Sequence, residues 1–204
     1  MDSLKIIQSD KPFIIKDNLM PKDIQKKARV LCYKYNNCDP SNFDLKKEIL
    51  KELIPNKSDL TFIEQGFKCD YGINIYTKGL CVINFNCTIL DTSKVEIGKN
   101  CFIAPNVVIA CSSHPIDPID RSNGYLVSKP ITIKDNVWIG ANSTICQGVT
   151  IGANSVIGAG SVVVKDIPDN VVAVGNPCKV LRPIRKEDKI EFNEMLKEYL
   201  VNEE

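Results

Sequence analysis

The sequence of 204 residues is poor in several residue types that catalytic and binding sites often use. It has one histidine, one tryptophan and three methionines, and its formal net charge is only +1. Because nucleic-acid binding needs clustered Lys and Arg, the balanced charge argues against nucleic acid as the main partner. One histidine is also too few for a zinc site that uses several imidazole ligands.

Long hydrophobic segments are missing as well. No stretch approaches the roughly 18 uninterrupted apolar residues of a membrane helix, and the N-terminal residues MDSLKIIQSDKPF lack the apolar core of a signal peptide. The nine cysteines are irregularly spaced, and no C-x-x-C pair occurs. We therefore expect a cytoplasmic protein with no membrane partner, whose reduced cysteines mostly fill small apolar spaces.

Both ends of the chain have helical patterns. In the N-terminal segment, residues 1–58, helices are predicted over 22–36 and 44–53, the second capped by Ser41 or Asn42. The first helix has one apolar face, made by Ile24, Ala28, Leu31, Cys32 and Tyr35. A C-terminal helix is predicted over residues 184–204. We expect both segments to cover the open ends of the central region, residues 59–183, where unpaired strands would otherwise be exposed.

The central region has a period of six residues, which fits neither an α-helix nor an ordinary strand. The aliphatic positions are Ile97, Ile103, Ile109, Ile133, Ile139, Ile145, Ile151, Ile157 and Val163. A short strand followed by a turn, repeated three times per coil, predicts a parallel β-helix with these side chains in an inward column. The same phase continues upstream at Phe67, Ile73 and Phe85, while Gly79 and Asp91 break it.

A single insertion, residues 111–130, interrupts the repeat without changing its phase. Long loops on a rigid scaffold are usually functional. The insertion contains the only histidine, His114, and an imidazole is able to accept a proton near neutral pH. His114 is therefore a candidate general base, although a lone surface histidine also commonly makes only a local hydrogen bond.

Several motifs, taken in order, resemble the maltose and galactoside O-acetyltransferases. They are YGIN (71–74), NFNCTILD (84–91), IGKNCFIAPNV (97–107), HPIDP (114–118), KPITIKDNVWIGANSTICQGVTIG (129–152), VIGAGSVVVKDIPDNVV (156–172) and GNPCKVLR (175–182). The resemblance covers about residues 20–183 and is nearest to the maltose branch. It implies a mainly β protein with a left-handed parallel β-helix, and a homotrimer that binds acetyl-CoA between subunits and needs no metal.

The resemblance also implies roles for individual residues. His114 corresponds to the general base, and Asn84 to the residue that hydrogen-bonds the acceptor sugar. The residues that match coenzyme A contacts, including the backbone amide of Ala141 as oxyanion donor, are Trp138, Ala141, Ala159, Lys165, Lys179 and Arg182. The residues that match acceptor contacts are Asp70, Asn84, Asp91 and Leu126.

Departures from the family pattern leave other functions open. Thr92 stands where galactoside enzymes carry a second acidic residue, and the N-terminal segment follows the family only loosely. The acceptor is a maltose- or glucose-type sugar in the favoured interpretation. Alternatives are serine, a xenobiotic or a polysaccharide sugar as acceptor, or a non-catalytic β-helix that serves as an assembly subunit.

Overall fold

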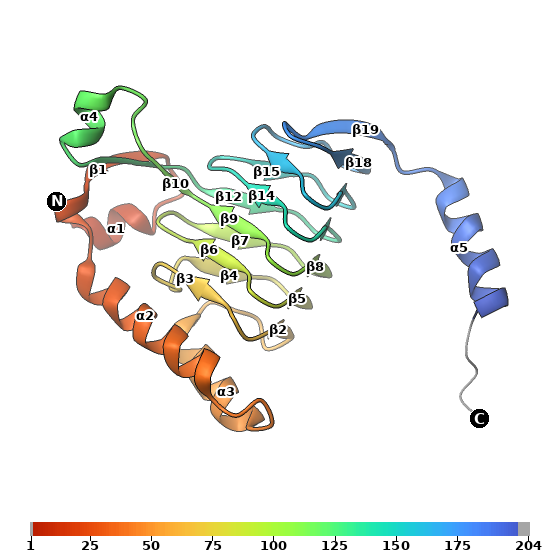
Figure 1. The fold of residues 1–204 in the computed structure, drawn as a ribbon, viewed down its shortest axis with the longest axis horizontal. Helices are drawn as coiled ribbons and strands as arrows, with labels where there is room; N and C mark the ends of the chain where they lie inside the picture. The colour runs from red at the N-terminus through yellow and green to blue at the C-terminus, as the bar shows by residue number, and fades with distance from the viewer. Residues whose placement is uncertain (1, 200–204) are drawn as a thin grey trace.

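In the computed structural model, which describes residues 2–199, short strands stack in parallel into a three-sided prism (Figure 1). The first side is a seven-stranded sheet, in the order β2 (Thr61–Ile63), β5 (Cys81–Ile83), β8 (Cys101–Ile103), β13 (Trp138–Ile139), β16 (Val156–Ile157), β18 (Val171–Val174) and β19 (Lys179–Pro183). Only β19 is antiparallel to its neighbour in this sheet.

The other two sides are smaller parallel sheets. The five-stranded sheet consists of β3 (Lys68–Cys69), β6 (Thr88–Leu90), β9 (Val108–Ala110), β14 (Thr144–Ile145) and β17 (Val162–Val163). The four-stranded sheet consists of β4 (Ile75–Thr77), β7 (Val95–Ile97), β12 (Ile131–Ile133) and β15 (Thr150–Ile151). The parallel β-helix predicted from the six-residue period is thus confirmed.

The inward column forms the core of the prism. All eight isoleucines that the period places inward, from Ile97 to Ile157, are at most 2% exposed. Along the seven-stranded sheet, Ile83, Ile103, Ile139 and Ile157 follow one another in register. Each of these isoleucines packs against the one in the adjacent coil, which removes a large apolar area from water.

The prediction that the six-residue period continues in phase at Phe67, Ile73 and Phe85 was wrong, because the first coils are longer than the later ones. Ile83 pairs with Ile103 twenty residues on, whereas Ile139 pairs with Ile157 after only eighteen. The two extra residues lie in the turn that leads from the five-stranded to the four-stranded sheet. Ile73 and Phe85 therefore fall off the inward column, and Phe85 is 51% exposed. Phe67 is buried, but four residues after the inward Ile63.

The first coil is covered by two helices, as expected from the sequence. They are α2 (Lys22–Asn37) and α3 (Phe43–Leu53), and Asn42 caps α3 by accepting from the Leu45 amide. The buried side of α2 joins the core of the β-helix, and the Tyr35 hydroxyl donates to the Ile63 carbonyl on β2. This end of the stack therefore presents no bare edge to solvent.

The C-terminal helix does not cover the opposite end, contrary to expectation. Figure 1 shows α5 (Lys186–Tyr199) standing away from the stack, and Phe192, Met195 and Tyr199 are each more than half exposed. The helix is tied to β19 by the ion pair of Arg182 with Asp188 instead. The last residues of the expected helix, 200–204, lie outside the described residues.

Three corners separate the sheets of the prism, and the chain passes each of them once per coil. The loop corner, between the five- and four-stranded sheets, comprises residues 70–74, 91–94, 111–130, 146–149 and 164–166. The ladder corner, between the four- and seven-stranded sheets, comprises residues 98–100, 134–137, 152–155 and 168–170. The third corner, between the seven- and five-stranded sheets, comprises residues 84–87, 104–107, 140–143 and 158–161.

Candidate active site

The insertion at the loop corner is an ordered structure of its own. It consists of β10 (Ser112–Ser113), α4 (Pro118–Ser122) and β11 (Tyr125–Ser128). β11 pairs antiparallel with β10 and with β1 (Phe13–Lys16), a strand that follows the short helix α1 (Ser3–Ile7) and precedes the 3-10 turn Asp17–Leu19. The helical interpretation of the N-terminal segment missed β1, because its partner lies more than a hundred residues away.

A second apolar cluster fixes the insertion to the prism. Its buried members are Ile7, Ile15, Met20 and Tyr71, and Leu126 of β11 packs against them. At the base of the insertion, the Ser128 hydroxyl lies within hydrogen-bond distance of those of Thr92 and Ser93, at 2.8 and 2.7 Å. The chain around His114 is therefore held from two sides.

The His114 side chain has a defined tautomer. Its Nδ1 lies 3.2 Å from the carbonyl oxygen of Tyr125, and the side chain is otherwise exposed. A carbonyl oxygen only accepts hydrogen bonds, so Nδ1 must carry the proton when the ring is neutral. The lone pair of Nε2 then faces solvent and is available to accept a proton. No side-chain signal in the sequence identifies Tyr125, since its backbone orients the ring.

Asp91 supports the loop corner from inside. It is fully buried, and its carboxylate accepts from the amides of Asp70, Tyr71 and Asn74 at 3.0, 2.9 and 3.2 Å. Burial raises the pKa of Asp91 to about 7, although the amides oppose this shift. Complete burial does not fit the direct acceptor contact that the resemblance implied. Asp91 instead holds the turn that carries Asp70.

Asp70 itself reaches a cavity. It lines a space of about 430 Å³ between α2 and the five-stranded sheet, together with Arg29 and Tyr33 of α2. Burial raises the pKa of its carboxyl, while a hydrogen bond from Gln25 and the charge of Arg29 oppose this effect. An acidic side chain beside an arginine and an aromatic ring is suited to polar ligands such as sugars.

A different set of expected residues gathers at the third corner. Asn84 lies there, and its side-chain oxygen accepts from the Phe85 amide at 2.8 Å. Ala141 and Ala159 lie at the same corner one coil apart, since the Gly160 amide donates to the Ala141 carbonyl. The Ala141 amide donates to no protein acceptor within residues 2–199. An unpaired, preoriented amide of this kind suits a developing oxyanion.

Close approach of backbone limits which residues fit this corner. A Cβ added at Gly140 would lie 2.5 Å from the Ala159 amide nitrogen, which no side chain tolerates. Trp138, two residues earlier on β13, is 54% exposed on the outer side of the seven-stranded sheet. Its indole is thus free to stack on a ligand.

The three basic residues expected to bind phosphates are placed differently. Lys165 follows β17, and Lys179 begins β19; both are exposed. Arg182 forms two hydrogen bonds with the Asp188 carboxylate, at 2.7 and 2.8 Å. The guanidinium of Arg182 also lowers the pKa of Asp188 to about 2. The guanidinium of Arg182 is therefore less available to a ligand than the ammonium groups of the two lysines.

One chain does not bring all these residues together. His114, Asp70 and Leu126 belong to the loop corner, whereas Asn84, Trp138, Ala141 and Ala159 belong to the third corner or its adjoining sheet. The five-stranded sheet lies between the two corners. A site that uses both groups therefore requires a second source for one of them.

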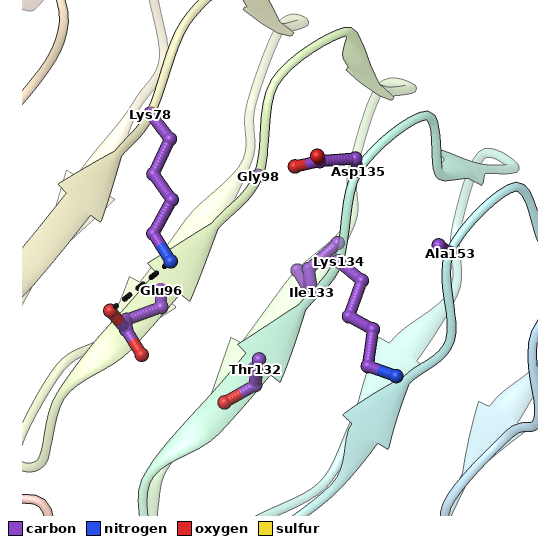
Figure 2. Close-up of a pocket in the computed structure, with 8 residues that line it drawn as sticks. All are labelled: Lys78, Glu96, Gly98, Thr132, Ile133, Lys134, Asp135 and Ala153. Carbon is purple, nitrogen blue, oxygen red and sulfur yellow. Dashed lines mark ion pairs between the residues drawn. The ribbon is translucent and has the colours of Figure 1, made fainter.

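The cavity in Figure 2 is unrelated to either group. It has a volume of about 200 Å³ and lies on the four-stranded sheet, toward the ladder corner, between Lys78, Glu96 and Lys134. Lys78 and Glu96 form an ion pair of 3.7 Å across its edge. Within residues 2–199, no three potential metal ligands cluster, and no helix is both long and apolar enough to span a bilayer.

Two known protein-family models match separate parts of the chain. Residues 130–165 match the bacterial transferase hexapeptide model (six repeats), and residues 22–57 match the maltose acetyltransferase hexapeptide capping motif. The second match covers the helices α2 and α3 that close the first coil.

Individual relatives match most of the chain. A putative acetyltransferase of Saccharomyces cerevisiae is 48% identical over 83% of this chain and 87% of its own. The galactoside O-acetyltransferase of Escherichia coli K12 is 45% identical over 80% of each chain. A solved galactoside acetyltransferase in complex with coenzyme A superposes with a TM-score of 0.85 at 40% identity, covering 93% of this chain and 94% of the other.

Proposed function

The chain belongs to the family of maltose and galactoside O-acetyltransferases, and we propose that it transfers acetyl from acetyl-CoA to a hydroxyl of a maltose- or glucose-type sugar. The acetyl-CoA-dependent O-acetyltransferase activity follows from the family. The sugar acceptor, the roles of single residues and the assembly are proposals. The observation that carries the mechanism is the contact between His114 Nδ1 and the Tyr125 carbonyl.

The proposed reaction is a direct transfer. His114 Nε2 removes the proton from the sugar hydroxyl while that oxygen attacks the thioester carbonyl. The Ala141 amide donates to the carbonyl oxygen as it gains negative charge. When the tetrahedral intermediate collapses, the bond between carbon and sulfur breaks, and the protonated imidazole returns the proton to the thiolate of coenzyme A. No covalent acetyl-enzyme forms.

The acceptor is proposed to lie between His114 and the polar groups of the loop corner. The Asp70 carboxylate accepts a hydrogen bond from one sugar hydroxyl. The side-chain amide group of Asn84 forms a hydrogen bond with a further hydroxyl. Leu126 contributes an apolar wall from β11, although it also packs in the second cluster. Asp91 acts behind them as a positioning residue, because its carboxylate holds the Asp70 turn.

Assembly is proposed to complete the site. Because His114 and Asn84 lie at different corners of one chain, we place the loop corner of one subunit against the third corner of the next in a homotrimer. The seven-stranded sheet offers an apolar outer surface for such contact. Phe62, Phe102 and Trp138 stand in line on it, and each is between 47% and 60% exposed. Exposed aromatics in line are unusual on a monomer surface.

Acetyl-CoA is proposed to bind at the third corner. The pantetheine arm lies against Ala159, the indole of Trp138 covers it, and Lys165, Lys179 and Arg182 face the phosphates. Positive side chains stabilise phosphate charge, and arginine does so with two hydrogen bonds. Arg182 must therefore exchange Asp188 for phosphate when coenzyme A binds.

A panel of acceptors tests this function. Purified protein is incubated with acetyl-CoA and, separately, with maltose, glucose, a galactoside, serine or chloramphenicol, and acetylated product is measured by mass spectrometry. Direct product detection is needed, because the nine cysteines of the protein react with thiol reagents that detect free coenzyme A. Maltose or glucose should give the highest kcat/KM. Preference for serine or chloramphenicol would overturn the sugar assignment, and absence of any product would favour an assembly role.

A further inference from the structure

Two cysteine thiols that the proposed reaction does not use lie in contact. Cys32 on α2 and Cys69 on β3 have their sulfur atoms 3.7 Å apart. Within residues 2–199, no other two cysteine sulfurs are close enough for a hydrogen bond. The contact joins the N-terminal helices to the first coil of the β-helix, two parts of the chain that are 37 residues apart.

Both thiols line a cavity that opens beside them. Each side chain belongs to the wall of the 430 Å³ cavity that Asp70 also lines, and each residue is 7% exposed. Arg29 and Lys68 line the same cavity. With Asp70, the third charged side chain of the lining, the wall carries a net formal charge of +1, which favours entry of a small reagent that carries carboxylates.

The two thiols differ in acidity. The hydrogen bond between the two sulfurs lowers the pKa of Cys32, whereas the same hydrogen bond and burial raise the pKa of Cys69 well above the usual value. Thiolates, not thiols, attack disulfides. Cys32 is thus the first nucleophile of the pair, and Cys69 is the thiol that follows.

We propose that Cys32 and Cys69 are a dithiol that closes to a reversible disulfide when a low-molecular-weight disulfide of the glutathione class enters this cavity. The Cys32 thiolate attacks one sulfur of the oxidant, which forms a mixed disulfide and releases one thiolate. Cys69 then loses its proton to that thiolate or to water and attacks the Cys32 sulfur. The second thiol leaves, so that two protein thiols are oxidised and one external disulfide is reduced.

The second step is favoured by the first. The Cys32 thiolate is itself one cause of the raised pKa of Cys69. Once Cys32 is a mixed disulfide, that negative charge is gone and Cys69 deprotonates more readily. The bond needs the sulfurs to approach from 3.7 Å to about 2.05 Å, which small rotations of both side chains supply.

The product ties α2 to β3 beside Asp70. The disulfide would join two residues 37 positions apart, which restricts the unfolded chain and so raises the stability of the folded protein. The helix α2, which covers the first coil, is then covalently linked to β3, and the two sulfur atoms in the cavity wall lie closer together. Reduction by a dithiol restores the open pair.

Thiol mapping tests the proposal on the intact protein. The reduced protein is incubated with oxidised glutathione and then digested without reduction. We expect a protein lighter by about 2 Da, a peptide linking Cys32 to Cys69, and a melting temperature about 5 °C higher that dithiothreitol reverses. Cys32→Ala and Cys69→Ala should lose the link and the shift.

Cys146→Ser is the matched control, since Cys146, directly after β14, is a half-buried thiol with no cysteine sulfur in hydrogen-bond contact among residues 2–199. This variant should still form the link. A stable glutathione adduct on Cys32 of the wild-type protein, a link between other cysteines, or nine intact thiols after incubation would each overturn the proposal. These outcomes need no catalytic assay and are therefore independent of the proposed transferase activity.

Discussion

The ladder corner and the loop corner belong to the same coils, yet the ladder corner keeps one turn length and one asparagine position, whereas the loop corner varies in length along the stack. At the ladder corner, Asn100, Asn136, Asn154 and Asn170 stand above one another with φ between 57° and 61°, and their amides form a chain of hydrogen bonds of 2.8–3.1 Å. Asp135 and Asp169 also accept backbone amides from the adjacent coil. The asparagine therefore recurs in all four of these coils, and an aspartate recurs in every second one.

The loop corner has turns of unequal length and polar groups that are buried. It contains the buried Asp91 carboxylate, the Ser128 hydroxyl contacts and the twenty-residue insertion that carries His114. Burying such groups costs free energy unless they are hydrogen-bonded, and here the Asp91 carboxylate and the Ser128 hydroxyl both have hydrogen-bond partners that fix the shape of the corner. The contrast indicates that the ladder corner specifies the scaffold and the loop corner specifies the chemistry.

The largest expected effect concerns the scaffold alone. Ile145→Ala removes a fully buried side chain from the inward column and should lower the free energy of unfolding by about 2–5 kcal/mol. Urea unfolding measures this change. Thr144→Ala is the control, because Thr144 is the outward neighbour on the same strand. Equal losses at the two positions would contradict an inward column.

The next effect concerns chemistry at the loop corner. His114→Ala should lower kcat by at least about a hundredfold, or about 2.7 kcal/mol in barrier, because a positioned base is lost. His114→Asn keeps the polar shape but accepts no proton, so it should be similarly impaired. The KM for acetyl-CoA and the unfolding midpoint should remain near those of the wild type.

A control within the insertion separates base loss from loop damage. Ser122 lies on α4, where its hydroxyl donates to the Ile119 carbonyl. Ser122→Ala should retain turnover, as measured by acetylated product. If His114→Ala retained near-normal turnover as well, the proposed base would be wrong; if an acetylated cysteine or serine transferred its acetyl group, direct attack would be wrong.

Sequence periodicity was sufficient to predict the parts of the fold that repeat. The eight isoleucines from Ile97 to Ile157 and the apolar face of α2 follow from local spacing, which packing then obeys. The extra residues around Asp70 and Asp91 could not be placed, because a turn of altered length carries no period. β1 was missed for a related reason: the strand with which it pairs, β11, is more than a hundred residues away.

The candidate site shows the same division. Motif order located His114 and Asn84, but only the structure shows that they lie at different corners. Complete burial of Asp91 depends on Tyr71 and Asn74 in the preceding coil, and no local pattern reports such a contact. Sequence therefore identified which residues to consider, and tertiary packing decided what each is able to touch.

The third effect is a pH dependence that belongs to the loop corner. The folded-state pKa of Asp91 is raised to about 7, above its unfolded value, so its contribution is fully present below pH 4 and is lost as pH rises through 7. Between pH 5 and 7.5 the wild type should lose about 2 kcal/mol from this group. Asp91→Asn should remove that slope in urea unfolding curves.

Asp169 at the ladder corner has a stability contribution with the opposite pH dependence. A hydrogen bond from Lys134 lowers the pKa of Asp169, so its contribution is present above the unfolded pKa and is lost as pH falls. Asp169→Asn should therefore leave the slope between pH 5 and 7.5 unchanged. If Asp169→Asn flattened that slope and Asp91→Asn did not, the buried carboxyl would not be its source.

The smallest expected effect tests whether the ladder corner is only a scaffold. Asn136 has φ of 59°, accepts from Asn100 and donates to Asn154. Asn136→Ala loses both hydrogen bonds and must hold a left-handed backbone conformation, so it should lower the free energy of unfolding by about 1 kcal/mol. Asn136→Gly loses the same bonds but adopts this conformation readily, so it should cost less. Because the ladder corner lies away from His114, both variants should keep the wild-type kcat. A loss of turnover comparable with that of His114→Ala would show that the two corners do not divide scaffold from chemistry.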